Sequence, residues 1–405
     1  MDALIFLLDF PYINEFLIDY KDYYKIVIVD RKRKINRAEL NRYYDEVCIV
    51  SDIQCKSEME QTFSRILESR QILAVYGTYE SVVEMAGYLR ETFDIPGMKY
   101  NASLRVRHKY MMKQTAVKQG IDTAKAILAR NVADVWAFIK ENGYPIVIKP
   151  VSGFATKYTY KIDSLSDFFE FKIMKMLFRH REFVIETFVN GEEYHCDSVV
   201  VDGKVVFSSV GKNLHNNLDT VSSGKPKGSI IFPSYCDQDK TIRDIKDFNE
   251  RVIGCYDIQD AVCHVEVFIN HEDRVVLGEI AVRIGGSPCI GACIKNTHDI
   301  DINKAFTDVE LKNYRSEGIS NSLVFTGYLA FPSKKGTIVE ISNVEDFYHI
   351  DGVKKVTIGN KPGDRIMKQS HTAVRTGYII IEDRNYHRLR EKLIHAFNSF
   401  RLTVK

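Results

Sequence analysis

The fold is decided by the stretch HVEVFINHEDRVVLGEIAVRIGG (264–286), in which two apolar runs flank a polar centre at 270–274. This pattern is typical of two antiparallel strands joined by a tight turn. Because the side chains of a strand point alternately to its two faces, Glu266 lies on the same face of its strand as His264 and Phe268. If the strands pair around the turn, Glu266 and Glu279 come close to opposite each other.

This pair of glutamates indicates a cation site. Two carboxylates that face each other on adjacent strands repel, and each raises the pKa of the other unless a cation lies between them. Mg²⁺ suits such a pair, because hard oxygen ligands and nucleotide phosphates form its usual shell. Arg283 follows Glu279 by four residues and is expected to point into the same site, where Gly285 and Gly286 allow the backbone to approach a ligand. The alternative is a surface pair in the sheet, with Arg283 as its counter-ion.

A second candidate site is a phosphate-binding cluster. Lys149 closes the apolar run IVIKP (146–150), and an ammonium group at the end of a buried strand needs an anionic partner. Lys109 lies in another basic stretch and is the second candidate ligand. The loop at 152–157 offers backbone N–H groups and the small or hydroxyl residues Ser152, Gly153 and Thr156. The sequence is not a Walker loop, and the alternative for Lys149 is a lysine that reaches solvent.

A third candidate site is the segment ETFVNGEEY (186–194). Glu186 ends a predicted strand, and the backbone around Phe188 and Val189 is placed to bind the edge of an adenine ring. After the turn, Glu193 is placed to accept hydrogen bonds from ribose hydroxyls. The alternative is a solvated surface turn.

The first hundred residues alternate short apolar runs with polar, helix-compatible stretches, which predicts βαβ units and a parallel sheet. The G-x-G-x-x-G fingerprint is absent after the first run, so we expect a Rossmann-like layer without a dinucleotide loop. The other predicted elements are strands at 146–150, 158–162 and 183–186, a hairpin at 194–207, a polar loop at 211–229, a helix at 239–253 and a last helix at 386–400.

The composition excludes several classes of protein. The 405 residues predict two to three domains, and 45% apolar with 27% charged residues exclude a disordered chain. The net charge of +2 provides no overall field that would attract nucleic acid or a membrane. We find no apolar run long enough for a membrane span and no secretory signal. Eight cysteines without C-x-x-C spacing predict reduced thiols in a cytoplasmic protein.

Taken together, GYPIVIKP (143–150), the segment at 186–194 and the segment at 264–286 resemble the ATP-grasp superfamily of carboxylate–amine ligases. The resemblance covers roughly residues 70–300, and Glu-Ile-Ala-x-Arg (279–283) is similar to the L-amino acid (dipeptide) ligase branch. It implies an α/β ATP-grasp fold with three parts: a Rossmann-like parallel-sheet domain at 1–105, a small α+β lid at 106–185, and a larger antiparallel-sheet α+β domain at 186–405.

The activity that the resemblance implies is ATP-dependent formation of an amide through an acyl phosphate, with release of ADP and phosphate. The product would be a dipeptide or an amino-acid amide, made in secondary metabolism such as antibiotic assembly. One alternative is a ligase that acts on a carrier-protein-tethered acceptor. Another is a catalytically silent nucleotide-binding regulatory protein. The expected partners are small-molecule carboxylates and amines, without nucleic acid or membrane, and a homodimer is possible.

The resemblance also implies roles for individual residues. Nucleotide binding falls to Lys109, Lys149, Ser152, Gly153, Thr156, Glu186, Phe188, Val189 and Glu193. One or two Mg²⁺ ions, with Mn²⁺ as a possible substitute, fall to Glu266 and Glu279. Many relatives have a metal-binding Asn where this sequence has Ala281, and this difference leaves the number of ions open. Arg283 would be catalytic and would also bind substrate, together with Gly285, Gly286 and Ser287. His195 and His264 flank the cleft and are expected to be structural rather than catalytic bases.

Overall fold

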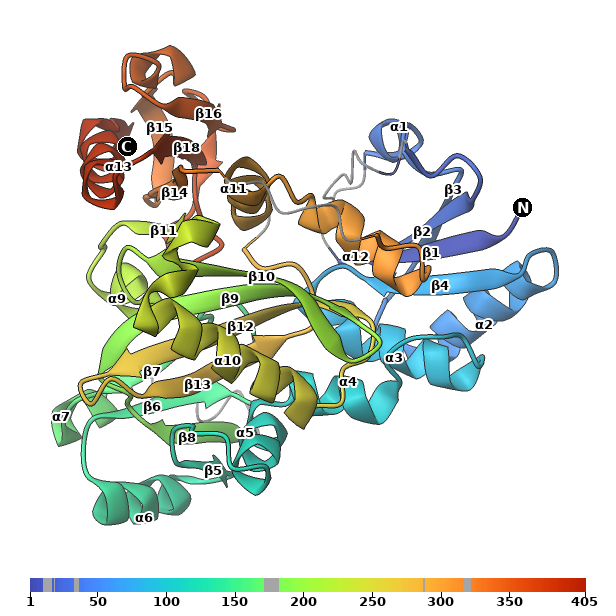
Figure 1. Ribbon diagram of the computed structural model, residues 1–405, viewed down its shortest axis with the longest axis horizontal. Coiled ribbons are helices and arrows are strands. Elements are labelled where there is room, and N and C mark those ends of the chain that lie inside the picture. The colour runs from blue at the N-terminus through green and yellow to red at the C-terminus, as the bar shows by residue number, and fades with distance from the viewer. Residues whose placement is uncertain (10–16, 18, 33–35, 171–181, 287, 316–321) are drawn as a thin grey trace.

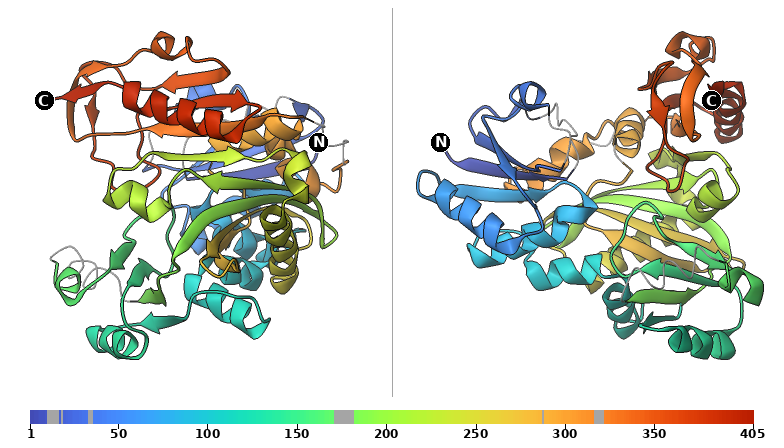
Figure 2. Two further views of the ribbon diagram at one scale, coloured as in Figure 1. Left: turned by 60° about the vertical axis from the view of Figure 1, so that its left-hand side comes forward. Right: turned by 180° about the vertical axis from the view of Figure 1, so that it is seen from behind.

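The computed structural model describes residues 1–9, 17, 19–32, 36–170, 182–286, 288–315 and 322–405. A parallel N-terminal sheet (blue in Figure 1) lies beside a large antiparallel sheet (green to orange). A small antiparallel sheet (teal) lies below the green and yellow strands of the large sheet. The C-terminal elements (orange-red to red), some of which extend the large sheet, lie above those strands, as both views in Figure 2 also show. These parts confirm the predicted α/β class with its parallel N-terminal sheet.

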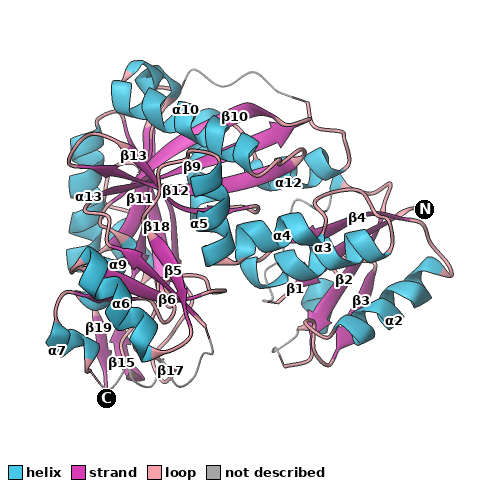
Figure 3. Cartoon of the chain, turned by 90° about the horizontal axis from the view of Figure 1, so that it is seen from below, coloured by secondary structure: helices cyan, strands magenta, loops and turns pink. Residues whose placement is uncertain are grey.

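The N-terminal sheet consists of the parallel strands β1 (Ala3–Leu8), β2 (Tyr24–Asp30), β3 (Glu46–Val50) and β4 (Ile72–Gly77). Its order is β3-β2-β1-β4, and α2 (Lys56–Leu67) and α3 (Val83–Thr92) lie beside it in Figure 3. Ile5 belongs to the apolar core that contains Phe63 of α2, whereas Phe6 belongs to the core that contains Phe306 of α12 (Ile302–Glu310). Burial on both faces explains why β1 is apolar throughout.

The small sheet is antiparallel and has the order β5-β8-β6-β7. Its strands are β5 (Ala126–Ala129), β6 (Ile146–Pro150), β7 (Tyr160–Ile162) and β8 (Phe183–Thr187), and its helices are α6 (Val132–Asn142) and α7 (Leu165–Phe168). Before this sheet come two helices, α4 (Tyr100–Arg107) and α5 (Lys109–Lys118). His108 separates them, because its backbone is extended and its imidazole accepts a hydrogen bond from the backbone N–H of Met111. Lys109 therefore sits at the start of α5.

The large sheet has eight antiparallel strands in the order β13-β12-β9-β10-β11-β14-β18-β16. These are β9 (Gly191–Val201), β10 (Lys204–Asn213), β11 (Lys227–Ile231), β12 (Ala261–Asn270), β13 (Val275–Ala281), β14 (Phe325–Phe331), β16 (Val353–Ile358) and β18 (Gly377–Asp383). Val265 and Val267 of β12 share an apolar core with Phe248 of α10 (Lys240–Cys255). His264 and Glu266 alternate with these valines and therefore lie on the opposite face of β12.

The C-terminal elements continue this sheet. Strands β14, β16 and β18 belong to it, whereas β15 (Gly336–Ile341), β17 (Arg365–Ile366) and β19 (Leu402–Val404) form a separate three-stranded sheet. The other helices are α1 (Arg37–Leu40), α9 (Asn217–Ser222), α11 (Cys289–His298) and α13 (Tyr386–Ser399). Among the described residues, none of the helices combines the length and apolar character needed to cross a bilayer.

One prediction about secondary structure is wrong. The segment 211–229 is not a polar loop, because it contains the end of β10, the helix α9 and the start of β11. Its strand residues are held by pairing with the preceding strand β9 and with β14, which is distant in sequence. The predicted domain boundaries after residues 105 and 185 remain predictions.

The register of the large sheet assembles a row of residues across four strands. Glu279 lies opposite Glu266, Glu266 opposite His195, and His195 opposite Gly211. The predicted opposition of Glu266 and Glu279 is thereby confirmed. A Cβ atom at Gly211 would lie 2.4 Å from Nε2 of His195, so glycine is required to make room for the imidazole ring.

Replacing Gly211 therefore tests this row. We expect Gly211→Ala to lower the free energy of unfolding by about 1–3 kcal/mol, because the added methyl group overpacks the His195 ring. Gly254→Ala in α10 is the matched control: its Cβ would meet nothing within 4 Å, and a gain of about 0.4–1 kcal/mol is expected. Urea denaturation measures both, and equal stability of the two variants would contradict this packing.

Candidate active site

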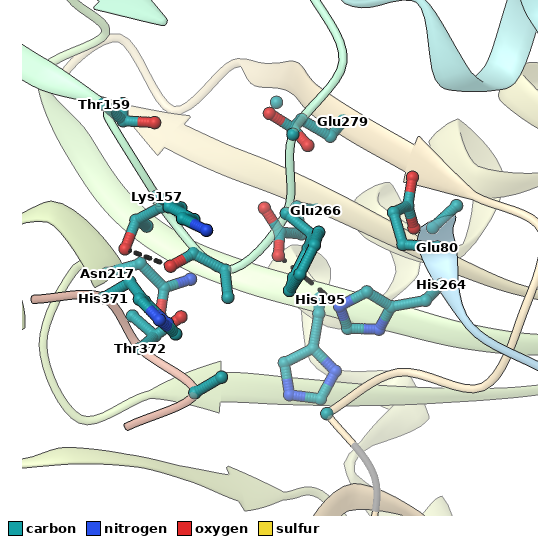
Figure 4. A pocket seen from close by; sticks show the side chains of 18 of the residues that line it. Glu80, Lys157, Thr159, His195, Asn217, His264, Glu266, Glu279, His371 and Thr372 are labelled. Atoms are coloured by element: carbon teal, nitrogen blue, oxygen red, sulfur yellow. Dashed lines mark hydrogen bonds and ion pairs between the residues drawn. The ribbon is translucent and has the colours of Figure 1, made fainter. Parts of the chain in front are cut away.

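Most of the predicted site residues line one cavity of about 1010 Å³. This is at the upper end of the roughly 300–1,000 Å³ typical of a site for one small molecule, so there is room for more than one. Its wall combines residues of the N-terminal part, the small sheet that contains β6, the large eight-stranded sheet and the C-terminal segment 371–375. Figure 4 shows part of this wall from close by.

The two predicted lysines meet carboxylates in this wall. Nζ of Lys149 lies 2.7 Å from Oε1 of Glu186 and 3.2 Å from Oε1 of Glu279. Nζ of Lys109 lies 2.5 Å from Oε2 of Glu279, and Lys113 lies 3.6 Å from Glu186. Withdrawal from water opposes ionisation of Glu279, yet Lys109 and Lys149 hold its pKa below the usual value. Glu279 thus connects the lysines to the strand pair.

Three carboxylates crowd the centre of the cavity wall. Burial and the nearby charge of Glu266 raise the pKa of Glu193 to about 7. Burial and the charge of Glu279 oppose ionisation of Glu266, but His264 and Lys227 hold its pKa below the usual value. Repulsion among carboxylates in one cavity is relieved by a cation, and hard oxygen donors of this kind fit Mg²⁺. The residues present therefore fit the metal that the sequence implies.

Behind Glu266 lies a buried network of two histidines and an aspartate. Asp197 accepts hydrogen bonds from Nδ1 of His195 at 2.6 Å and from Nδ1 of His264 at 2.9 Å. Burial disfavours a charged ring, but Asp197 and Glu266 raise the pKa of His264 to about 9. Ligand atoms of the three buried residues lie within 4.8 Å of one another, but hydrogen bonds already use the facing atoms. We assign the network a structural role.

Sequence reasoning missed two residues that orient this region. Asp197 carried a signal, because it shares the strand face of Glu193 and His195 through alternation in β9. Glu80, at the start of the 3₁₀ helix η2 (Glu80–Val82), carried none, because its partners are distant in sequence.

Glu80 holds two guanidinium groups. Its Oε2 lies 2.5 Å from Nε of Arg283, and its Oε1 lies 2.6 Å from Nη1 of Arg107. Nη1 of Arg107 also donates to the carbonyl oxygen of Gly153, so Glu80 links Arg283 to the predicted phosphate loop. Burial opposes ionisation of Glu80, but the two arginines hold its pKa below the usual value. Figure 4 shows Glu80 in the same cavity as Glu266 and Glu279.

The predicted phosphate loop at 152–157 is held from two sides. The backbone N–H of Lys109 donates to the carbonyl of Val151, and that of Thr372 donates to the carbonyl of Ala155. Ala155 and Thr156 have φ values of 55° and 58°, in the left-handed region. The loop is therefore held between α5 and the C-terminal segment 371–375.

The remaining predicted residues divide into two groups. Those that line the cavity, in addition to the lysines and glutamates above, are Gly153, Thr156, Phe188, Val189, Arg283 and Gly286. Ser152 is exposed and is not among the residues that line the cavity. Gly285 also lies outside that set: a Cβ there would lie 2.1 Å from Nδ1 of His264, so it makes room for the histidine. Ser287 lies outside the residues that the structure describes.

Comparisons with known proteins agree with this architecture. The ATP-grasp domain family matches residues 142–291, and the L-amino acid ligase C-terminal domain 2 family matches residues 329–405. An L-arginine-specific L-amino acid ligase of Bacillus subtilis is 25% identical over 354 residues, covering 85% of this chain and 84% of that protein. D-alanine–D-alanine ligase B of Clostridium perfringens is 28% identical over 128 residues, covering 31% of this chain and 42% of that protein.

Solved structures show the same fold. The L-amino acid ligase from Bacillus licheniformis superposes with a TM-score of 0.82 at 16% identity, covering 100% of this chain and 99% of that one. N5-carboxyaminoimidazole ribonucleotide synthetase from Thermotoga maritima gives 0.70 at 14% identity and full coverage of both chains. The predicted ATP-grasp fold is confirmed. The chain therefore contains an ATP-grasp domain at residues 142–291 and a C-terminal domain of the L-amino acid ligase type at residues 329–405.

Proposed function

We propose that the protein joins the carboxylate of an amino acid to the amine of a second substrate, with conversion of ATP to ADP and phosphate. The observation that carries this proposal is the placement of Glu266, Glu279 and Arg283 in one cavity with Lys109 and Lys149. The relative from Bacillus subtilis, an L-arginine-specific L-amino acid ligase, supports amino acids as substrates.

Nucleotide binding is assigned to one end of the cavity. Lys109 and Lys149 are proposed to hold the phosphates, because ammonium groups offset phosphate charge. The loop that contains Gly153 and Thr156 covers them. Glu186 and the backbone at Phe188 and Val189 bind the adenine, and Glu193 accepts from the ribose hydroxyls.

The metal is assigned to Glu266 and Glu279. Bound Mg²⁺ neutralises charge on the phosphoryl group that is transferred. His264 supports Glu266 from behind, with 3.6 Å between Nε2 of the ring and Oε1 of the carboxylate. These side chains fix where the terminal phosphate lies.

Two steps follow from this arrangement. A carboxylate oxygen of the first substrate attacks the γ-phosphorus, and the bond to ADP breaks, which gives an acyl phosphate. The amine of the second substrate then attacks the acyl carbon, the bond to the phosphate oxygen breaks, and the phosphate takes the proton of the amine. Arg283 stabilises the charge that develops on the acyl phosphate. Enclosure by the phosphate loop excludes water, which would hydrolyse this intermediate.

Several statements about the site are still predictions from the sequence. They concern ligand binding by Ser152, Gly285 and Ser287, the number of metal ions, and the use of Mn²⁺. The cytoplasmic location, the possible homodimer and a place in secondary metabolism are still predictions as well.

Pairwise incubation of amino acids with ATP and Mg²⁺ tests this function. We expect phosphate release that requires a carboxylate and an amine substrate, a ligated product in mass spectrometry, and loss of both on chelation of the metal. Glu279→Gln should lower turnover at least about 100-fold, because the amide replaces a metal-binding carboxylate. Glu272→Gln, in the exposed turn of the same hairpin, is the control and should retain activity. If the protein binds nucleotide but turns over none of the amino-acid pairs, the result would instead indicate a catalytically silent regulatory protein.

Glu80→Gln tests how Arg283 is held. The neutral amide weakens the grip on both guanidinium groups, so we expect kcat to fall about 10- to 100-fold while the KM for ATP changes little. Glu84→Gln, four residues on and away from the cavity wall, is the matched control. Thermal melting verifies that the variants fold, and Glu80→Asp should recover part of kcat. A defect confined to the KM for ATP would count against this role.

A further inference from the structure

Lys113 is a buried lysine of the cavity wall that has no role in the assignments above. It lies on α5 one turn after Lys109, so the two side chains project from the same face of the helix. The side chain of Lys113 is only 3% exposed. Withdrawing an ammonium group from water is costly unless hydrogen bonds and opposite charges replace the water. The partners of Lys113 therefore show what its charge stabilises.

The main partners of Lys113 are two consecutive carbonyl groups of β13. Nζ of Lys113 donates to the carbonyl oxygen of Leu277 at 2.9 Å and to that of Gly278 at 2.8 Å. Oε2 of Glu186 lies 3.6 Å from the same nitrogen. An ammonium group has three N–H donors, and these carbonyl groups use two of them. Lys113 is thus bound to the backbone directly before Glu279.

The two carbonyl groups belong to a β-bulge. Val267 of β12 lies opposite Leu277, but the preceding residue Glu266 lies opposite Glu279, so Gly278 is the extra residue of β13. In a regular strand, consecutive carbonyl groups point to opposite edges, whereas here both reach one ammonium group. An extra residue of this kind changes the direction of the side chains that follow it.

The bulge decides which face of the sheet Glu279 occupies. Leu277 and Val267 belong to the apolar core that the sheet shares with α10. Without the extra residue, alternation along β13 would place Glu279 on the same face as Leu277, in that core. With the bulge, Glu279 instead lies opposite Glu266 and lines the cavity, and Ile280 returns to the core.

Two further hydrogen bonds hold the bulge. The backbone N–H of Leu277 donates to the carbonyl oxygen of Asp122 at 2.7 Å, and Oγ1 of Thr123 donates to the carbonyl oxygen of Leu277 at 3.0 Å. These bonds form at the outer edge of β13, which is the first strand in the order of the large sheet. The bulge is therefore held from α5 and from the segment that follows it.

We propose that Lys113 is a positioning residue for the metal site: its ammonium group holds the bulge at Leu277 and Gly278 and thereby directs the carboxylate of Glu279 toward Glu266 and the metal. This inference rests on the proposed role of Glu279 in binding Mg²⁺. Lys113 acts through the backbone of β13 and does not itself bind the nucleotide. Direct contact of Lys113 with phosphate is the alternative, and the experiment separates the two.

The experiment measures how far Mg²⁺ tightens ADP binding, by calorimetric titration of the full chain with and without the metal. Lys113→Met removes the ammonium group and keeps most of the side-chain volume. We expect the ADP affinity without Mg²⁺ to stay within about threefold of wild type, because Lys109 and Lys149 remain. The gain from Mg²⁺ should fall about tenfold, because the charged hydrogen bonds that hold the bulge are lost.

Thr123→Val separates the hydrogen bonds from the charge. This variant removes one hydrogen bond to the carbonyl of Leu277 and leaves every charge in place, so the gain from Mg²⁺ should fall about two- to fivefold. Lys118→Met, exposed on the same helix, is the matched control and should keep the full gain. Tyr256→Phe removes a buried hydrogen bond to the carbonyl of Met112 in α5, and it should lower the melting temperature without changing the gain.

Three results would overturn the inference while leaving the proposed function intact. One is a full gain from Mg²⁺ in Lys113→Met, even with a lower melting temperature, which would leave Lys113 a purely structural role. Another is an equal loss of ADP affinity with and without Mg²⁺, which would make Lys113 a phosphate ligand. The third is a full gain in Thr123→Val beside a loss in Lys113→Met, which would assign the effect to charge alone.

Two further outcomes are also decisive. If Lys113→Met does not fold, Thr123→Val decides alone, and a full gain from Mg²⁺ in that variant contradicts the inference. If the wild-type protein shows no gain from Mg²⁺, the metal assignment under the proposed function fails, and this inference fails with it.

Discussion

The structure depends on the charge balance around Glu279, which faces Glu266 on one side and contacts two ammonium groups on the other. The lysines that hold Glu279 are the ones proposed to bind phosphates. Phosphate binding therefore competes for Lys109 and Lys149 and frees the oxygen atoms of Glu279 for a cation. Because the same side chain takes part in both contacts, binding of nucleotide and of metal becomes coupled in our account.

The fold supplies this balance through pairing between distant segments. The large sheet places Glu279, Glu266 and His195 in one row, while β6 and α5 bring in the two lysines from outside that sheet. The N-terminal part adds Glu80, which holds Arg283. Each part of the chain therefore contributes charge to one cavity, and the cavity depends on how the parts pack.

The sequence predicted those features that depend on local geometry. The closeness of Glu266 and Glu279 follows from a short turn, which pairs their two strands. The need of Lys149 for an anion was also predictable, but its partners Glu186 and Glu279 lie on other strands. Glu80 and Lys113 carried no local signal, because only tertiary packing brings them to the cavity. The segment 211–229 has the composition of a loop, yet pairing with β9 and β14 makes its ends strands.

Calorimetric titration with ADP, in the presence and absence of Mg²⁺, tests the coupling at Glu279 most directly. We predict that Mg²⁺ tightens ADP binding at least about tenfold in the wild-type protein and in Glu272→Gln, and that this gain disappears in Glu279→Gln. Equal ADP affinity with and without Mg²⁺, or a full gain in the Glu279→Gln variant, would contradict the account.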